Sequence, residues 1–485
     1  MSPSLLQFDG NGARYAQLAR ALKRAILQGE LKAGTALPPT RVLAAELGVS
    51  RNTALTAYEM LCAEQLAVAR VGSGTFVSMS MASADRPRIK VQVAAQSRYS
   101  RRLRALPRLT LRSVAPRLRY DLHYGEPLID PSLMAAWRRE LARAASAGEW
   151  GYPPSAGLRV LREAISEYLA RRRGVVCHAD DVVVVSGTQQ AVSLLARVLV
   201  DEGSIVAVED PGYELTSRAL QAHGARLLPI GIDAEGLRVE SLPRGNSVRM
   251  IQVSPSHQFP SGVVMSLARR LALLEYAAER GCWVVEDDYD GEFRYDGVAI
   301  PALRSLDTLD RVIYVGSFSK VMFPGLRLGY VVCPGGLRGD LVGAKMNDDL
   351  GCGGVEQAAL AGLMQSGAFD RHLRHASAEL RRRRTALLVG LQEHCGRHLV
   401  VDDSHAGMHM VGRLPGWTSL QVEALTAYAL GRGLGLHSIG PHYRRQPAPQ
   451  GLLLGYAALS AKQLRAATAL LGECLSQIAA RGVER

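Results

Sequence analysis

The stretch VIYVGSFSKVMFPGLRLGY, residues 312–330, carries the strongest chemical signal in the chain. It opens with a short β-branched run of the kind that is buried on both faces of a parallel sheet. Lys320 follows this run among hydroxyl side chains, and such a lysine can be desolvated and act as an imine-forming amine. Arg327, near Ser317 and Ser319, can hold a phosphate through two parallel hydrogen bonds.

Other short apolar runs upstream also end in polar residues. Gly187 and Thr188 follow the run 182–185 and begin a helix whose free amides suit an anion. Tyr213 follows a second run, and its ring can stack on a pyridine. Asp287 ends a third run, where a buried carboxylate keeps a pyridine nitrogen protonated, and Tyr289 can bond a ring hydroxyl. With Lys320 these features predict a site for pyridoxal 5'-phosphate (PLP).

Each feature also has an ordinary explanation when it is taken alone. Gly187 and Thr188 suit a simple helix cap, and Tyr213 suits a core position. The acidic cluster 286–290 suits a solvated strand end or a metal site. Their occurrence in one order, each at the end of a strand, argues against coincidence.

Helical patterns alternate with these apolar runs from Tyr120 onward. The alternation predicts an α/β domain over residues 120–485, with a mostly parallel sheet covered by helices on both faces. Residues from about 371 to 485 read as a smaller α+β lobe. The chain has 485 residues and 47% hydrophobic composition, without an apolar run of membrane-spanning length or a signal peptide. We therefore expect a cytoplasmic protein without a membrane partner.

Seven cysteines are scattered along the chain without a CxxC pair or a Cys/His ligand spacing. This arrangement indicates a reduced compartment and predicts no metal site.

The first 77 residues predict three helices and a β-hairpin. The helices are expected at 15–27, 41–47 and 51–65, with Thr40 and Ser50 as caps, and the hairpin strands at 67–71 and 75–77. This order is typical of a winged helix-turn-helix. The third helix begins with Arg51, Asn52 and Thr53, which suits a recognition helix entering the DNA major groove.

The positive charge of the chain is concentrated near this end. The net charge is +13, and residues 78–119 alone hold eleven Lys/Arg and one acidic residue. We expect an Arg-rich linker here, able to contact the DNA backbone. The alternative is a disordered, solubilising tether.

The stretch LPPTRVLAAELGVSRNTALTAYEMLCAEQLAVARVGSGTFV, residues 37–77, resembles the GntR-family winged helix, and the match extends over residues 14–77. The resemblance implies operator DNA as a partner and a nucleoid-associated location. The contacts that it implies are Arg41, Arg51, Asn52, Thr53 and Gly74. A winged helix serving as a protein-interaction module is the alternative.

From about Tyr120 the chain resembles the fold-type I aminotransferases, and the fusion resembles the MocR/GabR subfamily of GntR regulators. The resemblance implies that Lys320 forms an imine with PLP, Asp287 pairs with the pyridine nitrogen, and Tyr289 bonds the ring oxygen. Tyr213 would stack on the ring. Tyr152, in GYPPSAG, matches a tyrosine that reaches the partner subunit's phosphate in a head-to-tail homodimer. The residues that would hold the phosphate are Gly187, Thr188, Ser317, Ser319 and Arg327.

Two positions depart from an ordinary aminotransferase, and a third departs from the GABA-responsive member of the subfamily. Phe259 occupies the place of the asparagine in the NPTG motif. Leu453 stands where a strand arginine clamps the substrate α-carboxylate, and Leu215 replaces an arginine of the GABA-responsive member. A carboxylate without a bidentate partner binds weakly, so the departures argue against efficient transamination. Either the ligand is PLP itself, as in PdxR-type regulators of vitamin B6 metabolism, or Arg444 or Arg445 replaces the clamp, unless that loop is simply solvated.

These features together predict a PLP-dependent DNA-binding transcription regulator whose large domain modulates operator binding. Alternatives remain open. The effector can be PLP or a small amino compound, and the chain can be an active aminotransferase. A decayed cofactor domain that serves only for dimerisation is disfavoured by Lys320, Asp287 and Arg327.

Overall fold

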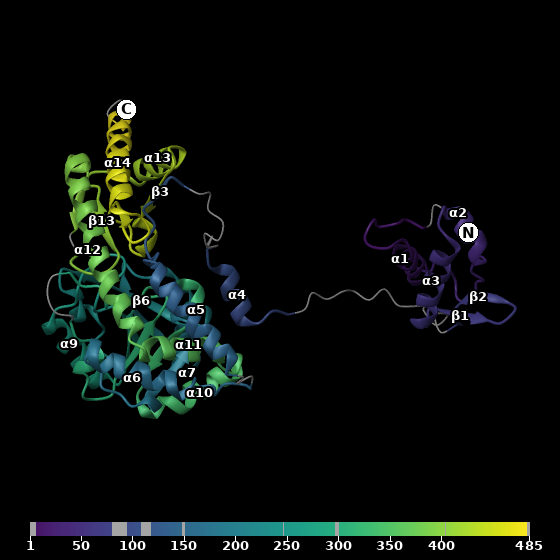
Figure 1. Cartoon of the computed structure of the whole chain (residues 1–485), viewed down its shortest axis with the longest axis horizontal. Coiled ribbons are helices and arrows are strands. Elements are labelled where there is room, and N and C mark those ends of the chain that lie inside the picture. Colours follow the sequence, from purple (N-terminus) through teal and green to yellow (C-terminus); the bar gives the residue numbers. More distant parts are fainter. Residues whose placement is uncertain are drawn as a thin grey trace. The chain divides into compact units, whose positions relative to one another are not determined.

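The computed structural model describes residues 6–79, 95–107, 118–147, 151–245, 247–295, 300–402 and 404–482. They form two compact units that divide between Ala95 and Gln96 (Figure 1). The predicted winged helix lies in the first unit, and the predicted α/β domain lies in the second. The predicted linker, residues 78–119, lies partly outside the described residues, and its part from Gln96 belongs to the large unit.

The N-terminal unit has the predicted three helices and antiparallel hairpin, in which Ala67 lies opposite Val77. Leu18 and Leu22 of the first helix are fully buried and share one core with Ala57 and Leu61 of the third. This amphipathic packing is what holds so small a unit together. Its elements are α1 (Arg14–Leu27), α2 (Thr40–Leu47), α3 (Arg51–Ala63), β1 (Ala67–Arg70) and β2 (Gly74–Val77).

Helix caps in this unit agree with the sequence at α3 and differ at α2. The Ser50 hydroxyl accepts a hydrogen bond of 3.1 Å from the backbone amide of Thr53, as expected of an N-cap. Thr40, expected to cap α2, is instead its first helical residue, because Pro39 occupies the cap position. The third helix ends at Ala63, two residues before the predicted Gln65, which has a left-handed φ of 59°.

The large unit is built on an eight-stranded sheet with the order β4-β11-β10-β9-β8-β5-β6-β7. Its strands run parallel except β11 and β7, which pair antiparallel with their neighbours. This confirms the expected mostly parallel sheet. The strands are β4 (Val182–Val185), β5 (Ile205–Asp210), β6 (Arg226–Asp233), β7 (Gly236–Leu237), β8 (Val248–Val253), β9 (Trp283–Asp288), β10 (Val312–Ser317) and β11 (Gly329–Val332).

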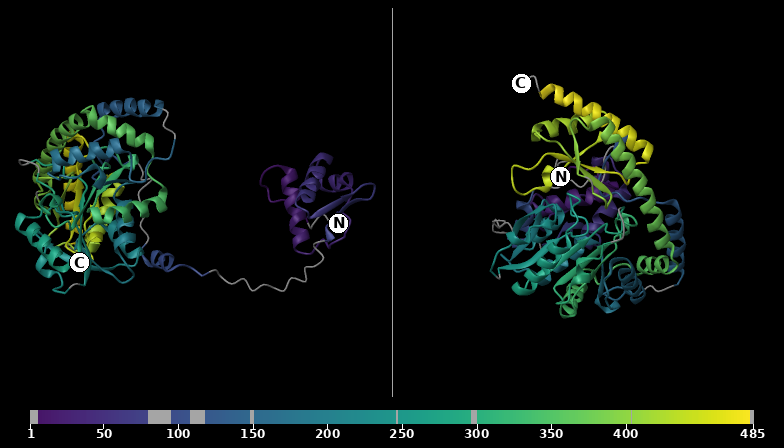
Figure 2. Two further views of the ribbon diagram at one scale, coloured as in Figure 1. Left: turned by 90° about the horizontal axis from the view of Figure 1, so that it is seen from below. Right: turned by 90° about the vertical axis from the view of Figure 1, so that its left-hand side faces the viewer.

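Helices cover both faces of this sheet, as expected (Figure 2). One face packs on α7, α8 and α10, and the other packs on α6, α9 and α11. Alternate residues of a strand serve the two faces: Val183 faces α7 and Val184 faces α6. The helices are α5 (Pro131–Ser146), α6 (Arg159–Arg173), α7 (Thr188–Leu199), α8 (Glu214–Ala222), α9 (Leu267–Arg280), α10 (Gly335–Asp349) and α11 (Gly354–Gln365).

A smaller α+β lobe follows, as predicted, and begins with the 28-residue helix α12. Its antiparallel sheet has the order β12-β13-β16-β15. The strand at Tyr120 joins this lobe by pairing in parallel with Leu434. The elements are α12 (Ala368–Cys395), β12 (Val400–Asp402), β13 (His409–Arg413), α13 (Ser419–Gly431), β14 (Leu434–Gly435), β15 (His437–Ser438), β16 (Gly451–Gly455), α14 (Ala461–Gly482) and β3 (Tyr120–Asp121).

Short 3-10 helices connect these elements: η3 (Ala179–Asp181), η4 (Val239–Ser241), η5 (Leu303–Leu306), η6 (Pro324–Leu326) and η7 (Gly440–His442). Among the described helices, none combines the length and the hydropathy that crossing a bilayer requires.

One helix of the predicted linker, α4 (Arg98–Ala105), lies against α8 of the large unit. Arg98 and Arg102 bind the carboxylate of Glu202 at 2.5 and 3.1 Å. Arg102 also donates to the carbonyl of Ala222 at the end of α8, and the Tyr99 ring lies 5.2 Å from that of His223. Arg98 and Arg102 of this helix therefore have partners within the large unit.

Candidate functional site

The candidate site lies where strands of the large sheet end. The parallel strands β5, β9 and β10 run in the same direction, so the residues after each strand meet at one edge of the sheet. In the ladder, Asp287 of β9 lies opposite Val315 of β10, two residues before Ser317. The tertiary structure therefore brings together residues that are more than a hundred positions apart in the sequence.

Lys320 lies just beyond β10 and is largely buried. Its amine donates a hydrogen bond of 2.6 Å to the carbonyl oxygen of Gly125, in the segment after β3. Burial lowers the pKa of this amine, while the carboxylates of Asp290, Glu126 and Asp287 act in the opposite direction. A lowered pKa makes the neutral, nucleophilic amine available at a higher fraction near neutral pH.

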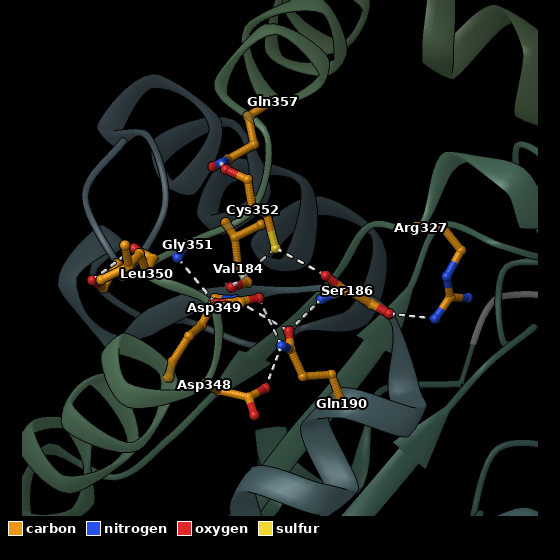
Figure 3. A network of polar contacts seen from close by, with 12 residues as sticks. Val184, Ser186, Gln190, Arg327, Asp348, Asp349, Leu350, Gly351, Cys352 and Gln357 are labelled. Atoms are coloured by element: carbon orange, nitrogen blue, oxygen red, sulfur yellow. Dashed lines mark hydrogen bonds and ion pairs between the residues drawn. The ribbon is translucent and has the colours of Figure 1, made fainter. Parts of the chain in front are cut away.

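Arg327 lies beside the start of α7. One of its guanidinium nitrogens donates to the carbonyl of Ser186 at 2.6 Å, as Figure 3 shows. A Cβ placed on Gly187 would lie 3.4 Å from two guanidinium nitrogens, so the glycine permits this close approach. The first amides of a helix have no partner within it, so the guanidinium and these amides, which include that of Thr188, form a site suited to an anion.

Hydrogen bonds through Gln190 connect the start of α7 to α10. The amide of Ser186 donates to the side chain of Gln190, whose own amide donates to Asp348 and Asp349 of α10 (Figure 3). Cys352 approaches the Ser186 hydroxyl at 3.5 Å. A hollow of about 440 Å³ borders this region, with Ser186, Arg327 and Cys352 in its lining. The anion site is thus rigid on its protein side and open on the other.

Ser317 and Ser319 flank the lysine side of the site. The Ser317 hydroxyl accepts a hydrogen bond of 3.1 Å from the amide of Ser319, which fixes the turn that follows β10.

Asp287 is 6% exposed, and its Oδ1 atom has no hydrogen-bond partner among the described residues. Burial raises the pKa of this carboxyl to about 7, with Asp288 and Asp290 adding to the effect and Lys320 opposing it. A buried carboxylate oxygen without a partner is costly, because nothing replaces the water that it has lost. The residue is therefore poised to pair with a protonated nitrogen of a ligand.

Tyr289, on the loop after β9, takes part in a small polar cluster that sequence reasoning missed. Its hydroxyl lies 3.0 Å from Nδ1 of His257, and the same nitrogen lies 3.0 Å from the carboxylate of Asp290. If Nδ1 carries the proton that it donates to Asp290, the tyrosine proton stays free for a ligand. His257 stands two residues before Phe259 in the sequence. The only sequence feature that pointed to His257 was therefore the departure from NPTG at Phe259.

His257, Asp290 and His409 are also buried close enough together, within 4.8 Å, to resemble a metal site among the described residues. In the structure, Nδ1 of His257 lies 3.0 Å from the Asp290 carboxylate and Nε2 of His409 lies 3.1 Å from the carbonyl oxygen of Pro260. Nε2 of His257 is buried and has no hydrogen-bond partner among the described residues.

Tyr213 lies at the N-terminus of α8, with its ring 5.5 Å from that of Phe259 and nearly perpendicular to it. Burial raises the pKa of its hydroxyl to about 12, and the charge of Asp287 adds to the shift. Tyr213 and Phe259 therefore lie in the same region as Asp287, as the sequence predicted for Tyr213.

None of the three residues considered for the carboxylate clamp contacts Lys320 in the structure. Leu453 of β16 is fully buried and packs in a cluster with Phe259. The guanidinium of Arg444 lies 3.5 Å from Glu214, and that of Arg445 donates to the carbonyl of Pro229. Both arginines thus have partners outside the contacts of Lys320, which favours the structural interpretation of this loop.

Tyr152 is a predicted site residue that makes no described contact with the rest of the candidate site. Its side chain is 88% exposed, and no described contact ties it to the lysine, the aspartate or Arg327. A role in this site of the same chain is not supported by the contacts, and its predicted role toward a partner subunit stays a prediction.

The predicted DNA-reading residues are grouped at the surface of the small unit. Arg41, Arg51 and Asn52 are exposed at the starts of α2 and α3. Thr53 is half-buried and pairs its hydroxyl with that of Ser50 at 2.9 Å. Gly74, at the hairpin, has a φ of 105° that suits glycine and lies opposite Arg70.

Comparison with known proteins identifies both units. Residues 120–430 match the family described as aminotransferase class I and II, and residues 14–77 match the bacterial regulatory proteins of the gntR family. The chain is 37% identical to the "Probable rhizopine catabolism regulatory protein MocR" of Rhizobium meliloti, over 95% of this chain and 93% of the relative. It is 30% identical to the HTH-type pyridoxine biosynthesis transcriptional regulator PdxR of Corynebacterium glutamicum, over 95% of each chain.

Solved structures resemble the large unit. The kynurenine aminotransferase of Pyrococcus horikoshii, in complex with PMP, superposes with a TM-score of 0.68 at 27% identity, over 75% of this chain and 91% of that one. The α-aminoadipate aminotransferase LysN of Thermus thermophilus, complexed with N-(5'-phosphopyridoxyl)-L-leucine, gives 0.68 at 29%, over 74% and 92%. The chain therefore belongs to the aminotransferase class I and II family and, through its N-terminal GntR unit, to the MocR type of GntR transcription regulators.

Proposed function

We propose that the chain is a transcription regulator that binds operator DNA through its small unit and PLP through Lys320 of its large unit. DNA binding then responds to the ligand state of the large unit. The observation that carries the proposal is the grouping of Lys320, Asp287 and Arg327 around one edge of the sheet in a chain that also has a GntR unit.

The residues present fit PLP. Lys320 offers a buried amine for the aldehyde, and Asp287 offers a partnerless oxygen for the ring nitrogen. Arg327 and the start of α7 offer a cradle for the phosphate, to which Gly187, Thr188, Ser317 and Ser319 contribute. Tyr213 supplies a ring for stacking, and Tyr289 a hydroxyl for the ring oxygen. When bound, PLP supplies an electrophilic carbon and a ring that withdraws electrons.

The residues around the cofactor would orient it and hold protons at defined atoms. Asp287 keeps a proton on the ring nitrogen, because a buried carboxylate without a partner gains most from a cationic neighbour. The Arg327 guanidinium fixes the phosphate end, while burial around Lys320 excludes water from its amine. These roles bind and position a ligand whether or not turnover follows.

The DNA-binding unit would read the operator with Arg51 and Asn52 at the start of α3, helped by Arg41, Thr53 and Gly74. A head-to-tail homodimer would place two such units on one operator, with Tyr152 reaching the partner subunit's phosphate. Its 88% exposure in a single chain supports that arrangement, because the side chain is free to contact a second copy. The proposed location is the cytoplasm, on the nucleoid.

A route for coupling is offered by α4 and α8. Tyr213 precedes α8 directly, and α8 ends at Ala222, whose carbonyl accepts from Arg102 of α4. A ligand that moves Tyr213 would therefore shift the end of the linker that leads to the DNA-binding unit. Only a ligand with different affinities for two arrangements can produce such a shift.

Two ligands are consistent with this scheme: PLP itself and a small amino compound that binds next to it. An active aminotransferase is the second candidate function, favoured by the likeness to solved aminotransferases and opposed by Leu453 at the clamp position.

The test uses the full-length protein and DNA from the promoter region beside its own gene. We expect the protein to turn yellow with PLP, a borohydride-trapped adduct to map to Lys320, and the operator affinity or footprint to differ between PLP-free and PLP-loaded protein. Lys320→Ala is the matched variant and should bind DNA without this response.

Two results would count against the proposal. A colourless protein without an adduct would reduce the chain to a plain winged-helix regulator. Steady release of keto acid from amino acids, with unchanged DNA binding, would favour the aminotransferase instead.

A further inference from the structure

A group of five rings packs together next to Gly125, the hydrogen-bond partner of Lys320. We call it the aromatic wall, and its members are Tyr124, Phe259, His409, His437 and His442. Phe259 lies at its centre, with ring centroids 4.9 Å from His442, 5.3 Å from Tyr124 and 5.6 Å from His409. Tyr124 also lies 5.8 Å from His437, edge to face. The five rings come from four separate segments of the chain and meet only in the fold.

The aromatic wall adjoins the lysine. Tyr124 directly precedes Gly125, whose carbonyl accepts the hydrogen bond from the Lys320 amine at 2.6 Å. The charge of Lys320 contributes to the lowered pKa of His409, which places the two groups within electrostatic reach. A ligand that reaches the lysine amine therefore has these rings beside it.

The base of the aromatic wall is aliphatic. Leu453, Val411 and Ile439 are buried and share one cluster with Phe259. Leu453 is the residue at the position where an aminotransferase would carry its carboxylate-binding arginine, and it is fully buried. Arg444 and Arg445, the arginines that could have replaced it, bind Glu214 and the carbonyl of Pro229.

Charge around the lysine also disfavours an acid. The carboxylates that act on the Lys320 amine are Asp290, Glu126 and Asp287. His409 and His442 carry no compensating positive charge near neutral pH, because burial lowers the pKa of His409 to about 3 and that of His442 to about 4. A carboxylate placed here would lose water and gain like-charged neighbours.

We propose that the effector site beside Lys320 takes a primary amine on a neutral body, without a carboxylate. The proposal rests on the proposed function, since it assigns the ligand class of the same site. The ammonium is attracted by the carboxylates and by the faces of the rings. The neutral body packs against Tyr124 and Phe259, and Leu453 lies buried beneath Phe259.

Polar groups on that body also have partners. The Nδ1 atom of His442 is buried and has no hydrogen-bond partner among the described residues. It is a neutral group that can serve a hydroxyl or an amide of the ligand. The ligand does not need a carboxylate to form a hydrogen bond with this nitrogen.

The test compares amines with their own carboxylated counterparts on PLP-loaded, full-length protein. Isothermal titration calorimetry measures 2-phenylethylamine against L-phenylalanine, and n-butylamine against 4-aminobutyrate. We expect each amine to bind at least about tenfold more tightly than its acid. Both ligands carry the same amine, but only the acid must bury a carboxylate without a partner, and that burial costs free energy. Equal or tighter binding of the acids, including through an arginine of a partner subunit, overturns the inference.

PLP loading is measured first, by absorbance and by borohydride trapping at Lys320. A protein that takes up PLP but prefers the acids refutes this inference alone. A protein that takes up no PLP refutes the proposed function, and the inference falls with it. The two failures are therefore distinguishable.

Two variants sharpen the result. Leu453→Arg should reverse the preference, raising the affinity for L-phenylalanine relative to 2-phenylethylamine by about tenfold. Because a buried arginine can disrupt β16, folding is checked by circular dichroism, and His442→Phe serves as a second, milder variant. It should weaken an amine that bears a hydroxyl, tyramine, by at least threefold while leaving 2-phenylethylamine unchanged. An unchanged preference in folded Leu453→Arg, or equal effects on both amines in His442→Phe, contradicts the inference.

Discussion

The Lys320 amine lies 2.6 Å from the carbonyl oxygen of Gly125, and residue 125 has no space for a side chain. A Cβ there would lie 2.6 Å from the lysine nitrogen, and the backbone φ of +79° is one that other residues rarely adopt. The strand β3 that precedes Gly125 is paired with β14 of the small lobe. The Lys320 amine, just beyond β10 of the large sheet, is therefore held by a segment that pairs with the small lobe.

Replacing Gly125 with alanine should weaken PLP binding, because the new Cβ would lie 2.6 Å from the lysine nitrogen and would push this end of the side chain away from the Gly125 carbonyl. The backbone strain of a left-handed alanine costs only about 1 kcal/mol, and Gly281→Ala tests this strain alone, since φ is +64° there and nothing lies within 4 Å of a Cβ. Absorbance titration with PLP measures the effect. Similar PLP affinities in the two variants would show that the collision does not matter.

The stability of the PLP-free protein should fall as the pH rises through the range in which Asp287 loses its proton. Burial raises the pKa of this carboxyl to about 7, against about 3.9 in an unfolded chain. Between these values the folded protein holds a proton that the unfolded chain has released. Stability is therefore lost progressively from about pH 4 to pH 7, and the loss is complete above that.

Asp287→Asn removes this titration. Relative to the native chain, the variant should gain on the order of 1 kcal/mol or more in unfolding free energy between pH 5 and pH 8. Urea denaturation at the two pH values measures the difference, and Asp201→Asn, at an exposed turn, is the control. The assignment is wrong if the two variants show the same pH dependence.

Glu202→Ala should weaken the response of DNA binding to the ligand. It removes the carboxylate that binds Arg98 and Arg102 of α4 and leaves the Arg102–Ala222 hydrogen bond as the polar contact between α4 and α8, so the docking of α4 should loosen. Because exposed ion pairs contribute little to stability, the fold and PLP binding should persist. Gel shifts with and without PLP measure the response, and Glu240→Ala, which breaks an exposed pair with Arg238, is the control. A full PLP response in Glu202→Ala would rule out this route.

Arg51→Ala should weaken operator binding by about 10- to 100-fold, since a bidentate base contact is worth about 1–3 kcal/mol. The side chain is exposed at the start of α3 and contributes no core contact, so the unit should stay folded. Arg24→Ala, near the end of α1, removes an equal charge away from the recognition helix. Equal losses in fluorescence anisotropy with operator DNA would mean that only net charge counts.

The sequence identified most residues of the candidate site because they lie in local patterns. Lys320 follows a buried strand, Asp287 ends another, and Gly187 begins a helix, so each was identifiable from a few neighbours. The register of β9 and β10 and the approach of Arg327 to Gly187 then bring these residues together. Parallel strands make this step predictable, since their carboxyl ends share one edge.

Other residues could not be found in this way. His257 and Asp290 are 33 positions apart, and neither lies in a pattern that marks a hydrogen-bonded pair. Tyr124 and His442 belong to opposite ends of the large unit, yet their rings lie 5.9 Å apart. The docking of α4 on α8 was also missed, because an arginine-rich helix with no buried residues resembles a solvated linker.

The sequence by itself determined the two units, their secondary structure and the chemical identity of the reactive groups, because hydrophobic periodicity, caps and short motifs are local properties of the chain. The tertiary structure decided what surrounds those groups: the glycine carbonyl at the lysine, the partnerless aspartate oxygen, and the rings that pack over Leu453. Burial and proximity set these properties, and both arise only when distant segments pack together and exclude water.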